Sequence, residues 1–308
     1  MKLRDYQAQL DKWTDSEIKK AEKELQKMYS KNLQGVYSEL NKLYMKYEED
    51  GQLTYAEMMR YNRLEKFLND LNKEFELLRK LKEAAIVGLF LAAFNHSYRY
   101  NSWALARERL VNTPLKQSLS EVAKEVLDKP FSGLTIAQRL KRNHSNLLYD
   151  IREKVTRLLI NGSSFKQMGK AIKETLEKDL NKSIAVTRTE TYRARSEAAY
   201  IQAEAVHDSG IRQTKEWISM KDERVRNTRN ANHVKMDSVK VAMDDYFDLG
   251  GGKYTLAPHM SGYPEHDINC RCSLAFDSEP TEEQQNKELK DLDYESYIEI
   301  TFSGDGFD

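Results

Sequence analysis

Residues 265–272 read Glu265-His266-Asp267-Ile268-Asn269-Cys270-Arg271-Cys272. This stretch contains both cysteines of the chain, and Cys270 follows His266 by four positions. Thiolate and imidazole are the ligands that Zn²⁺ prefers. In an extended strand, side chains two residues apart lie on the same face, so both sulfurs would face one tetrahedral ion. A disulfide across so tight a ring would be strained. The stretch therefore predicts metal ligation.

A second histidine, His233, lies upstream beside charged residues. Together the four residues give a Cys₂His₂ zinc site of unusual spacing: His233, His266, Cys270 and Cys272. Because CxC is less specific than paired CxxC, two reduced structural cysteines and a reactive thiol or disulfide stay open as alternatives. His259 competes with His266 as the nearby ligand. The remaining histidines are expected on helices as ordinary surface or core residues, and these are His96, His144 and His207.

The composition fits a soluble, largely helical protein of one large or two modest domains. The chain has 308 residues, of which 40% are hydrophobic and 32% are charged, and its 49 Lys/Arg balance its 49 Asp/Glu. Net charge therefore implies neither a nucleic-acid nor a membrane partner. Two cysteines give no disulfide framework. The N-terminus shows no apolar signal core, and the apolar run at 84–94 is far shorter than the roughly 20 residues that span a bilayer.

Charge is distributed unevenly along the chain. The region Arg139–Glu197 holds 14 Lys/Arg against 7 Asp/Glu, whereas Asp277–Asp308 holds 2 against 11. The basic region is interpreted as a solvated helical surface, with contact to double-stranded DNA as the alternative. The possible DNA contacts are Arg139, Lys141, Arg142, Arg152, Lys154 and Arg157.

The first 113 residues contain no proline and three glycines, which favours long helices. Thr14-Asp15-Ser16-Glu17 has the spacing of a capping box, and apolar residues then recur every three or four positions up to Tyr47. Residues 48–51 stop this helix, and Thr54 opens a second one. Short connections make consecutive helices antiparallel neighbours, so we expect a hairpin or bundle arm.

The remaining sequence predicts a mainly α protein with a small C-terminal α+β module. Helices are expected over 119–128, from near Ile136, and over about 184–208, and strands over 214–219, 254–256 and 272–276. About 65 residues with few aliphatic side chains make a poor core, so a structural metal would supply what burial cannot. The predicted regions are a helical arm (1–113), a helical middle (114–210), a Cys/His module (211–276) and an acidic tail (277–308).

Two further expectations concern helix faces and the tail. Arg193 and Glu197 lie one helical turn apart, and their segment is interpreted as a solvated face with ion pairs. Disorder is expected from Asp277 to about Lys290. Residues 298–302 alternate like a strand that could add to a sheet edge.

Several motifs occur in a fixed order, and together they cover about half of the chain. They are Phe131-Ser132-Gly133-Leu134-Thr135 with Arg139, Gly162-Ser163-Ser164, Arg188-Thr189-Glu190, Trp217, Asp222-Glu223-Arg224-Val225-Arg226, His233 with Asp237, and Pro264, His266 and Asn269-Cys270-Arg271-Cys272. In this order they resemble the Mu F-like phage head morphogenesis family, also called minor head or minor capsid proteins. The helical N-terminus is similar to the gram-positive siphophage branch. Ser238 departs from the family's usual glycine.

The resemblance implies a non-enzymatic virion protein present in few copies at the portal or the capsid interior, made in the host cytoplasm. It implies a role in head assembly, DNA packaging or ejection, with the N-terminal helices docking to the portal or other head proteins. It strengthens the prediction of Zn²⁺. Residues that would support the ligands or their turns are Asp222, Arg224, Arg226, Asp237, Arg188, Glu190 and Trp217.

One rival class is a metal-dependent hydrolase or nuclease that uses His233, Asp237, His266 and Glu190 with an open position for water. The sequence lacks an HExxH helix, a GxSxG elbow and a phosphate loop. Four good zinc ligands favour a closed structural site. We therefore expect no enzyme activity, no small-molecule substrate and no membrane partner.

Overall fold

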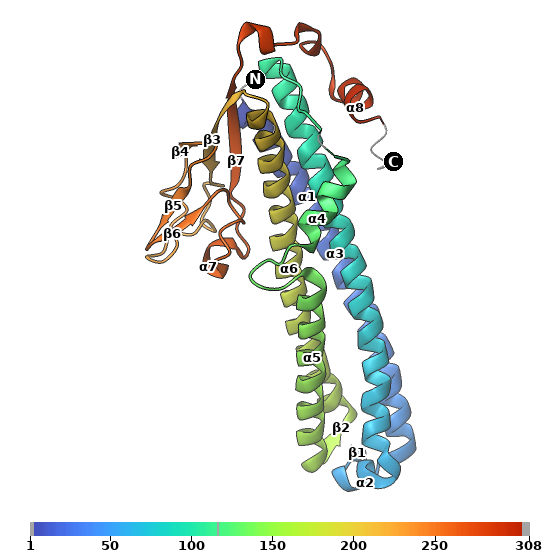
Figure 1. Cartoon of the computed structure of the whole chain (residues 1–308). Coiled ribbons are helices and arrows are strands. Elements are labelled where there is room, and N and C mark those ends of the chain that lie inside the picture. Colours follow the sequence, from blue (N-terminus) through green and yellow to red (C-terminus); the bar gives the residue numbers. More distant parts are fainter. Residues whose placement is uncertain (1–2, 116, 304–308) are drawn as a thin grey trace. The chain divides into compact units, whose positions relative to one another are not determined.

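The structure is a computed structural model that describes residues 3–115 and 117–303. Figure 1 shows long helices and, after α6, a group of short strands, which confirms the predicted fold class. The helices are α1 (Leu3–Tyr47), α2 (Tyr55–Met59), α3 (Arg63–Arg109), α4 (Leu119–Asp128), α5 (Ile136–Ile160), α6 (Phe165–Asp208), α7 (Pro264–Asp267) and α8 (Tyr294–Phe302). The strands are β1 (Gln52–Leu53), β2 (Ser163–Ser164), β3 (Arg212–Ile218), β4 (Lys240–Ala242), β5 (Phe247–Gly250), β6 (Lys253–Thr255) and β7 (Ser273–Glu279).

The chain divides into two compact units, each assembled from separate segments of sequence. Unit 1 comprises Met1–Lys19, Val87–Thr135 and Arg188–Asp308, and unit 2 comprises Lys20–Ile86 and Ile136–Thr187. The long helices α1, α3 and α6 each contribute to both units. No helix among the described residues is long and apolar enough to cross a membrane.

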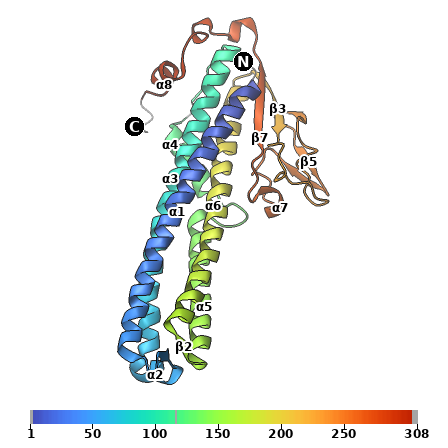
Figure 2. The same cartoon turned by 180° about the vertical axis from the view of Figure 1, so that it is seen from behind.

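Unit 2 is a helical body with one apolar core. Figure 1 and Figure 2 both show α5 running alongside the first part of α6. The core takes residues from α1, α3, α5 and α6, including the predicted apolar positions Tyr29, Val36 and Leu40. Thr54 caps α2 as expected, because its hydroxyl accepts a hydrogen bond from the Glu57 amide. The three-to-four spacing of apolar residues therefore does form a buried helix face.

The predicted capping box at Thr14 does not cap a helix. Thr14 lies inside α1, and its hydroxyl donates a 2.8 Å hydrogen bond to the Leu10 carbonyl. The helix already includes Leu3, because Tyr6 and Leu10 are themselves buried and extend the apolar face upstream. Burial of these side chains outweighs the local preference of a threonine for a helix start.

Unit 1 contains a three-stranded antiparallel sheet in the order β4-β3-β7. Its long register pairs Arg212 with Glu279 and Ile218 with Ser273. The inner face carries Trp217 and Leu274, which are buried in one cluster with both cysteines. The expected strands at 214–219 and 272–276 are confirmed within a few residues, and 254–256 corresponds to β6 in the β5–β6 hairpin.

The acidic tail differs from expectation. β7 continues to Glu279, and two short 3-10 helices, Glu282–Gln284 and Lys287–Leu289, occupy the segment expected to be disordered. The predicted strand at 298–302 is wrong, because this segment belongs to α8. The Asp293 side chain caps α8 by accepting from the Ser296 amide at 2.8 Å. Tyr297 is buried, so helical rather than alternating spacing matches the side chains that need burial.

Candidate metal centre

Three predicted ligands converge at one point of unit 1. His233 Nδ1 lies 3.4 Å from the Cys270 sulfur and 3.5 Å from the Cys272 sulfur. One ligand atom from each residue lies within 4.8 Å of the others, and all three side chains are buried. Two thiolates and an imidazole fit a borderline-soft cation such as Zn²⁺ better than a hard cation such as Mg²⁺. This group could therefore hold a metal ion.

A turn, rather than the expected extended strand, brings the two sulfurs together. Both cysteines precede β7, and the Cys270 amide donates to the Asp267 carbonyl at 3.2 Å. Asn269 adopts a left-handed conformation with φ of 56°, which asparagine tolerates better than most residues. The Cys272 amide then points at the Cys270 sulfur, 3.4 Å away. The backbone itself thus orients one thiolate.

The two thiols titrate as a pair. Burial raises the pKa of Cys270, but hydrogen bonds from Cys272 and His233 and the nearby His259 lower it well below its ordinary value. The pKa of Cys272 is raised well above its ordinary value, first by the hydrogen bond to Cys270 and then by burial. The Cys270 thiolate is therefore favoured, and it accepts a hydrogen bond from the protonated Cys272 thiol. A divalent cation would replace that proton and stabilise both thiolates.

The fourth predicted ligand, His266, lies outside this group of three. Its Nδ1 is 3.2 Å from His233 Nε2, and the two rings stack with centroids 5.4 Å apart. Burial, followed by the charge of His233, lowers the pKa of His266. The His266 ring is therefore suited to the neutral state that imidazole–imidazole hydrogen bonding requires.

A further histidine lies beside the cysteines. His259 is 1% exposed, and neither ring nitrogen makes a hydrogen bond of normal geometry among the described residues, although its ring interacts with the Cys270 thiol. Its ring is nearly parallel to that of Tyr192, with centroids 5.9 Å apart and 7° between planes. Its backbone is left-handed, with φ of 67°. The sequence offered His259 only as a competitor of His266.

Trp217 and Arg226 support His233 from two sides. The Trp217 ring meets the His233 ring edge-on at 5.3 Å. The His233 amide donates to the Arg226 carbonyl at 2.8 Å, while the Arg226 guanidinium hydrogen-bonds the Ile268 carbonyl. These contacts tie the His233 segment to the loop that precedes the cysteines.

Asp222 forms an ion pair that sequence analysis missed. Arg271, the residue between the two cysteines, donates to both Asp222 oxygens at 2.6 Å. The Asp222 side chain also accepts from the Arg224 amide at 3.1 Å. The hydrogen bond from Arg271 is the main cause that lowers the pKa of Asp222. A charged residue inside a CxC sequence was the available signal for a partner across the turn.

Asp237 faces cations rather than the metal ligands. It accepts a 3.0 Å hydrogen bond from the Ser219 amide and forms ion pairs with Arg4 and Lys221, both at 3.2 Å. Burial raises its pKa, but these donors lower it below the ordinary value. Its role in this structure is to hold β3, through Ser219, next to the segment that follows His233.

The interpretation of the Arg193 segment as a solvated face is wrong. Arg193 is buried and donates to Glu190 at 2.8 Å, to Glu197 at 3.0 Å and to the Val126 carbonyl at 3.0 Å. One turn earlier, the Thr189 hydroxyl accepts a 3.0 Å hydrogen bond from the Asn269 amide. This part of α6 is therefore an internal scaffold for the turn that carries the cysteines.

The centre has no room for a substrate. The hollow that includes His233 and both cysteines has a volume of about 10 Å³. A cavity needs roughly 10–15 Å³ by this measure to hold one water molecule. The carboxylates of the hydrolase alternative are also engaged elsewhere, because Glu190 pairs with Arg193 and Asp237 pairs with Arg4. These features favour a closed structural site.

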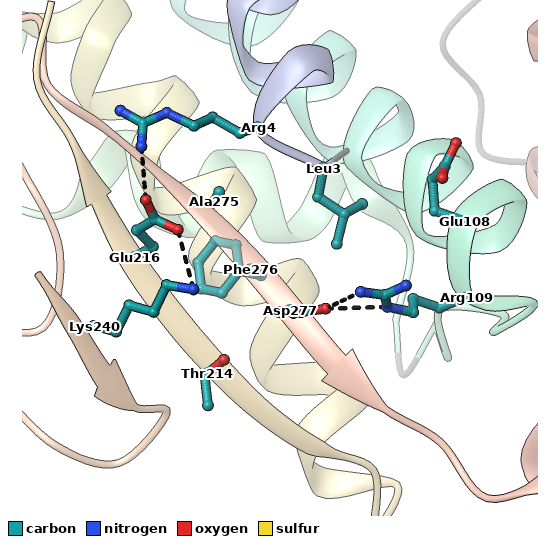
Figure 3. A pocket seen from close by; sticks show the side chains of 10 residues that line it. All are labelled: Leu3, Arg4, Glu108, Arg109, Thr214, Glu216, Lys240, Ala275, Phe276 and Asp277. Atoms are coloured by element: carbon teal, nitrogen blue, oxygen red, sulfur yellow. Dashed lines mark hydrogen bonds and ion pairs between the residues drawn. The ribbon is translucent and has the colours of Figure 1, made fainter. Parts of the chain in front are cut away.

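A larger pocket of about 490 Å³ lies elsewhere in unit 1 (Figure 3). Its charged lining is paired: Glu216 binds Arg4 at 2.8 Å and Lys240 at 3.6 Å, and Arg109 binds Asp277. No cysteine or histidine lines this pocket. It therefore lacks the chemistry of the candidate centre.

Several of the predicted DNA-contacting cations on α5 have intramolecular partners. Arg152 forms a two-pronged ion pair with Glu65 at 2.7 and 2.8 Å. Arg157 pairs with Glu153, and Lys154 donates to the Thr175 hydroxyl at 2.7 Å. Contact with DNA would have to compete with these interactions.

Comparison with known proteins agrees with the motif order. Residues 149–275 match the model of the family described as Phage Mu protein F like protein. The minor head protein GP7 of Bacillus phage SPP1 is 28% identical over 278 residues, which cover 88% of this chain and 86% of that protein. These matches confirm the predicted resemblance to Mu F-like phage minor head proteins.

Two other relatives cover much of the chain. An NAD(+)–arginine ADP-ribosyltransferase, EFV, of Enterococcus faecalis is 24% identical over 301 residues, 92% of this chain but 60% of that protein. The uncharacterized protein YqbB of Bacillus subtilis is 23% identical over 252 residues, 75% of this chain and 78% of that protein. No solved structure matches the chain.

Proposed function

We propose that this chain is a portal-associated phage minor head protein whose C-terminal module is held together by a structural Zn²⁺ ion. It acts in head assembly and in DNA packaging or ejection, from the capsid interior near the portal. The observation that carries the proposal is the similarity to a minor head protein over 88% of the chain, joined to the convergence of His233, Cys270 and Cys272.

Zinc is the proposed ion because of its donor set. Two thiolates with imidazole are a typical structural zinc environment, and the ion stabilises a module that buries few aliphatic side chains. Reduced protein should contain one zinc per chain by metal analysis, and replacing both cysteines by serine should abolish this content. Wild-type protein that stays metal-free after purification in zinc-containing medium would refute this part of the proposal.

We assign portal docking to the turn between α1 and α3, which exposes apolar side chains. Met45 is 80% exposed and Tyr61 is 81% exposed, and Met59 lies between them in sequence. Next to Tyr61, a groove of about 310 Å³ has Leu43 and Phe67 in its lining. Exposed large apolar side chains beside a groove are a feature of protein interfaces.

Docking is tested by co-purification of the tagged chain with the portal protein of the same phage. Met45→Glu with Tyr61→Asn should abolish co-purification without unfolding the chain, because both side chains lie in solvent and asparagine tolerates the left-handed backbone at Tyr61. The matched control is Leu77→Glu, which changes another exposed apolar residue, on α3. Equal loss of binding in the control would exclude a specific role for the turn.

We propose that the chain is not an enzyme. The ADP-ribosyltransferase relative extends well beyond its match to this chain, so its named activity need not reside in the shared part. The small hollow at the metal centre and the paired carboxylates support this view. Incubation with labelled NAD⁺ and an arginine acceptor should yield no ADP-ribosylated product, and a turnover above the background of the Cys270→Ser variant would contradict it.

A further inference from the structure

The metal centre is one ligand short. Structural zinc sites are almost always four-coordinate and use protein ligands at every position. His233, Cys270 and Cys272 supply three. The hollow at the site is about 10 Å³, at the lower limit for a single water molecule. The fourth ligand should therefore come from the protein, and two buried histidines contact or interact with members of this group: His266 with His233 and His259 with Cys270.

His266 is on the wrong side of the His233 ring. His233 turns its Nδ1 toward both sulfurs and its Nε2 toward His266. The two nitrogens of an imidazole point in divergent directions, so a group bonded to Nε2 faces away from a metal bound to Nδ1. Histidine ligands commonly donate their other ring N–H to a partner that fixes the ring orientation. The position of His266 Nδ1 suits it to accept that hydrogen bond.

His259 has the features of a metal ligand. It is nearly inaccessible, and neither ring nitrogen makes a hydrogen bond of normal geometry among the residues that the structure describes, whereas in His266 this holds for Nε2 alone. Burying two unpaired ring nitrogens is unfavourable unless something else binds one of them. The left-handed backbone adds strain, which is typical of residues held for a function.

The loop that carries His259 is fixed against α6. The Ser196 hydroxyl donates to the Pro258 carbonyl at 2.7 Å, and the Tyr192 ring stacks on the His259 ring. On the other side, the Asp267 carboxylate accepts from the Gly262 amide at 2.9 Å. These contacts fix the loop of His259. The His259 ring interacts with Cys270 but lies outside the group of three ligand atoms, so it would have to move toward a shared ion.

We infer that His259 is the fourth protein ligand of the metal and that His266 is a positioning residue that orients His233. This inference rests on the proposed zinc site and specifies its ligand set. It replaces the predicted His266 ligand by a histidine that comes from the loop before α7 rather than from α7 itself.

The first test compares His259→Asn with His266→Asn, because both remove an imidazole from the same module. Full-length protein is loaded with Co²⁺, and the absorption of the metal is recorded. Wild-type protein should show the intense bands of a four-coordinate thiolate site. His259→Asn should lose this intensity as water or another weak ligand enters, while His266→Asn should keep it. Asparagine is chosen because it tolerates the left-handed backbone at His259.

Zinc affinity gives a second readout. His259→Asn should weaken zinc binding by more than about 100-fold, whereas loss of an outer partner such as His266 typically costs about 10–100-fold. The melting temperature of each variant is also measured with zinc and with EDTA. The compared quantity is the rise in melting temperature that zinc causes within each variant. Packing that a substitution loses in the metal-free state then cancels out. This rise should be smaller for His259→Asn than for His266→Asn.

The outcomes separate the two proposals. A four-coordinate spectrum that survives in His259→Asn and is lost in His266→Asn would overturn the assignment of His259 while leaving the zinc site intact. Equal effects of both variants would also overturn it. Wild-type protein that binds neither Co²⁺ nor Zn²⁺ would instead refute the metal site itself, and with it the ligand set.

Discussion

Lys82 Nζ lies 2.6 Å from Asp179 Oδ2 inside unit 2, and the two side chains are 2% and 3% exposed. Lys82 also donates to the Tyr29 hydroxyl at 2.9 Å, and that hydroxyl hydrogen-bonds Asp179. Burial lowers the pKa of Lys82, although the charge of Asp179 opposes this shift. This buried charge pair links α1, α3 and α6 inside an apolar core. It fixes how the three helices align along their axes more strictly than apolar contacts alone would.

Lys82→Met should destabilise unit 2 strongly. The substitution leaves the Asp179 carboxylate buried without its cation, and breaking a buried pair in this way costs about 3–5 kcal/mol. The measurement is the free energy of unfolding by urea, followed by circular dichroism. Lys73→Met, which removes an exposed partner of Asp70, is the matched control and should change stability little. If the two variants unfolded at the same urea concentration, the buried pair would have no such role.

Arg193→Lys should also destabilise, although charge is kept. Lysine cannot reproduce the forked contacts to Glu190, Glu197 and the Val126 carbonyl. The substitution also removes the guanidinium that lies 4.8 Å from the centroid of the Phe90 ring. We expect a loss of about 2–4 kcal/mol, since at least one buried carboxylate loses its partner. Thermal unfolding measures it, with Arg157→Lys on the surface of α5 as the control. A melting temperature equal to that of wild type would contradict the structural assignment.

His96 should contribute acid sensitivity. It stacks on Trp13 at 3.9 Å, and burial lowers its pKa from 6.5 to about 4. Between these pH values the unfolded chain binds a proton that the folded chain does not, so stability falls as pH decreases through this window. His96→Phe removes the group but keeps an aromatic ring against Trp13.

The variant should therefore lose less stability than wild type between pH 6.5 and pH 4. The measurement is the free energy of unfolding by urea at several pH values for wild type and the variant. Taking the difference between the two proteins cancels the contributions of all other titrating groups. The His96 assignment fails if that difference stays constant across the window.

Metal removal should loosen the Cys/His module and spare the helices of unit 2. In the Cys270→Ser, Cys272→Ser double variant, amide hydrogen exchange should accelerate in β3 and β7, because the metal no longer holds the loops on the inner face of the sheet. Exchange in α5 should stay as in wild type. Chelation of wild-type protein should reproduce the pattern, and unchanged protection of β7 in both samples would argue against a structural ion.

The helical part of the fold could be predicted from sequence because its signals are local. Apolar residues every three or four positions between Ile18 and Tyr47 can bury only one face as a helix, and Thr54 caps the next helix. Two local patterns gave wrong predictions: the capping-box spacing at Thr14 and the strand-like alternation at 298–302. In both places burial of apolar side chains outweighs the weak local preference, and these side chains are Tyr6, Leu10 and Tyr297.

The sequence by itself determined the long helices of the arm, and it predicted that two thiols and an upstream histidine share a site, since their chemistry fits a single metal ion. Only the tertiary structure decided which histidine faces the sulfurs and which faces the far side of a ring. It also decided that Arg193 is buried among its hydrogen-bond acceptors and that Lys82 forms an ion pair with Asp179. The physical reason is distance along the chain: these partners are brought together by packing of separate helices and loops, and a local pattern carries no information about the direction in which a side chain then points.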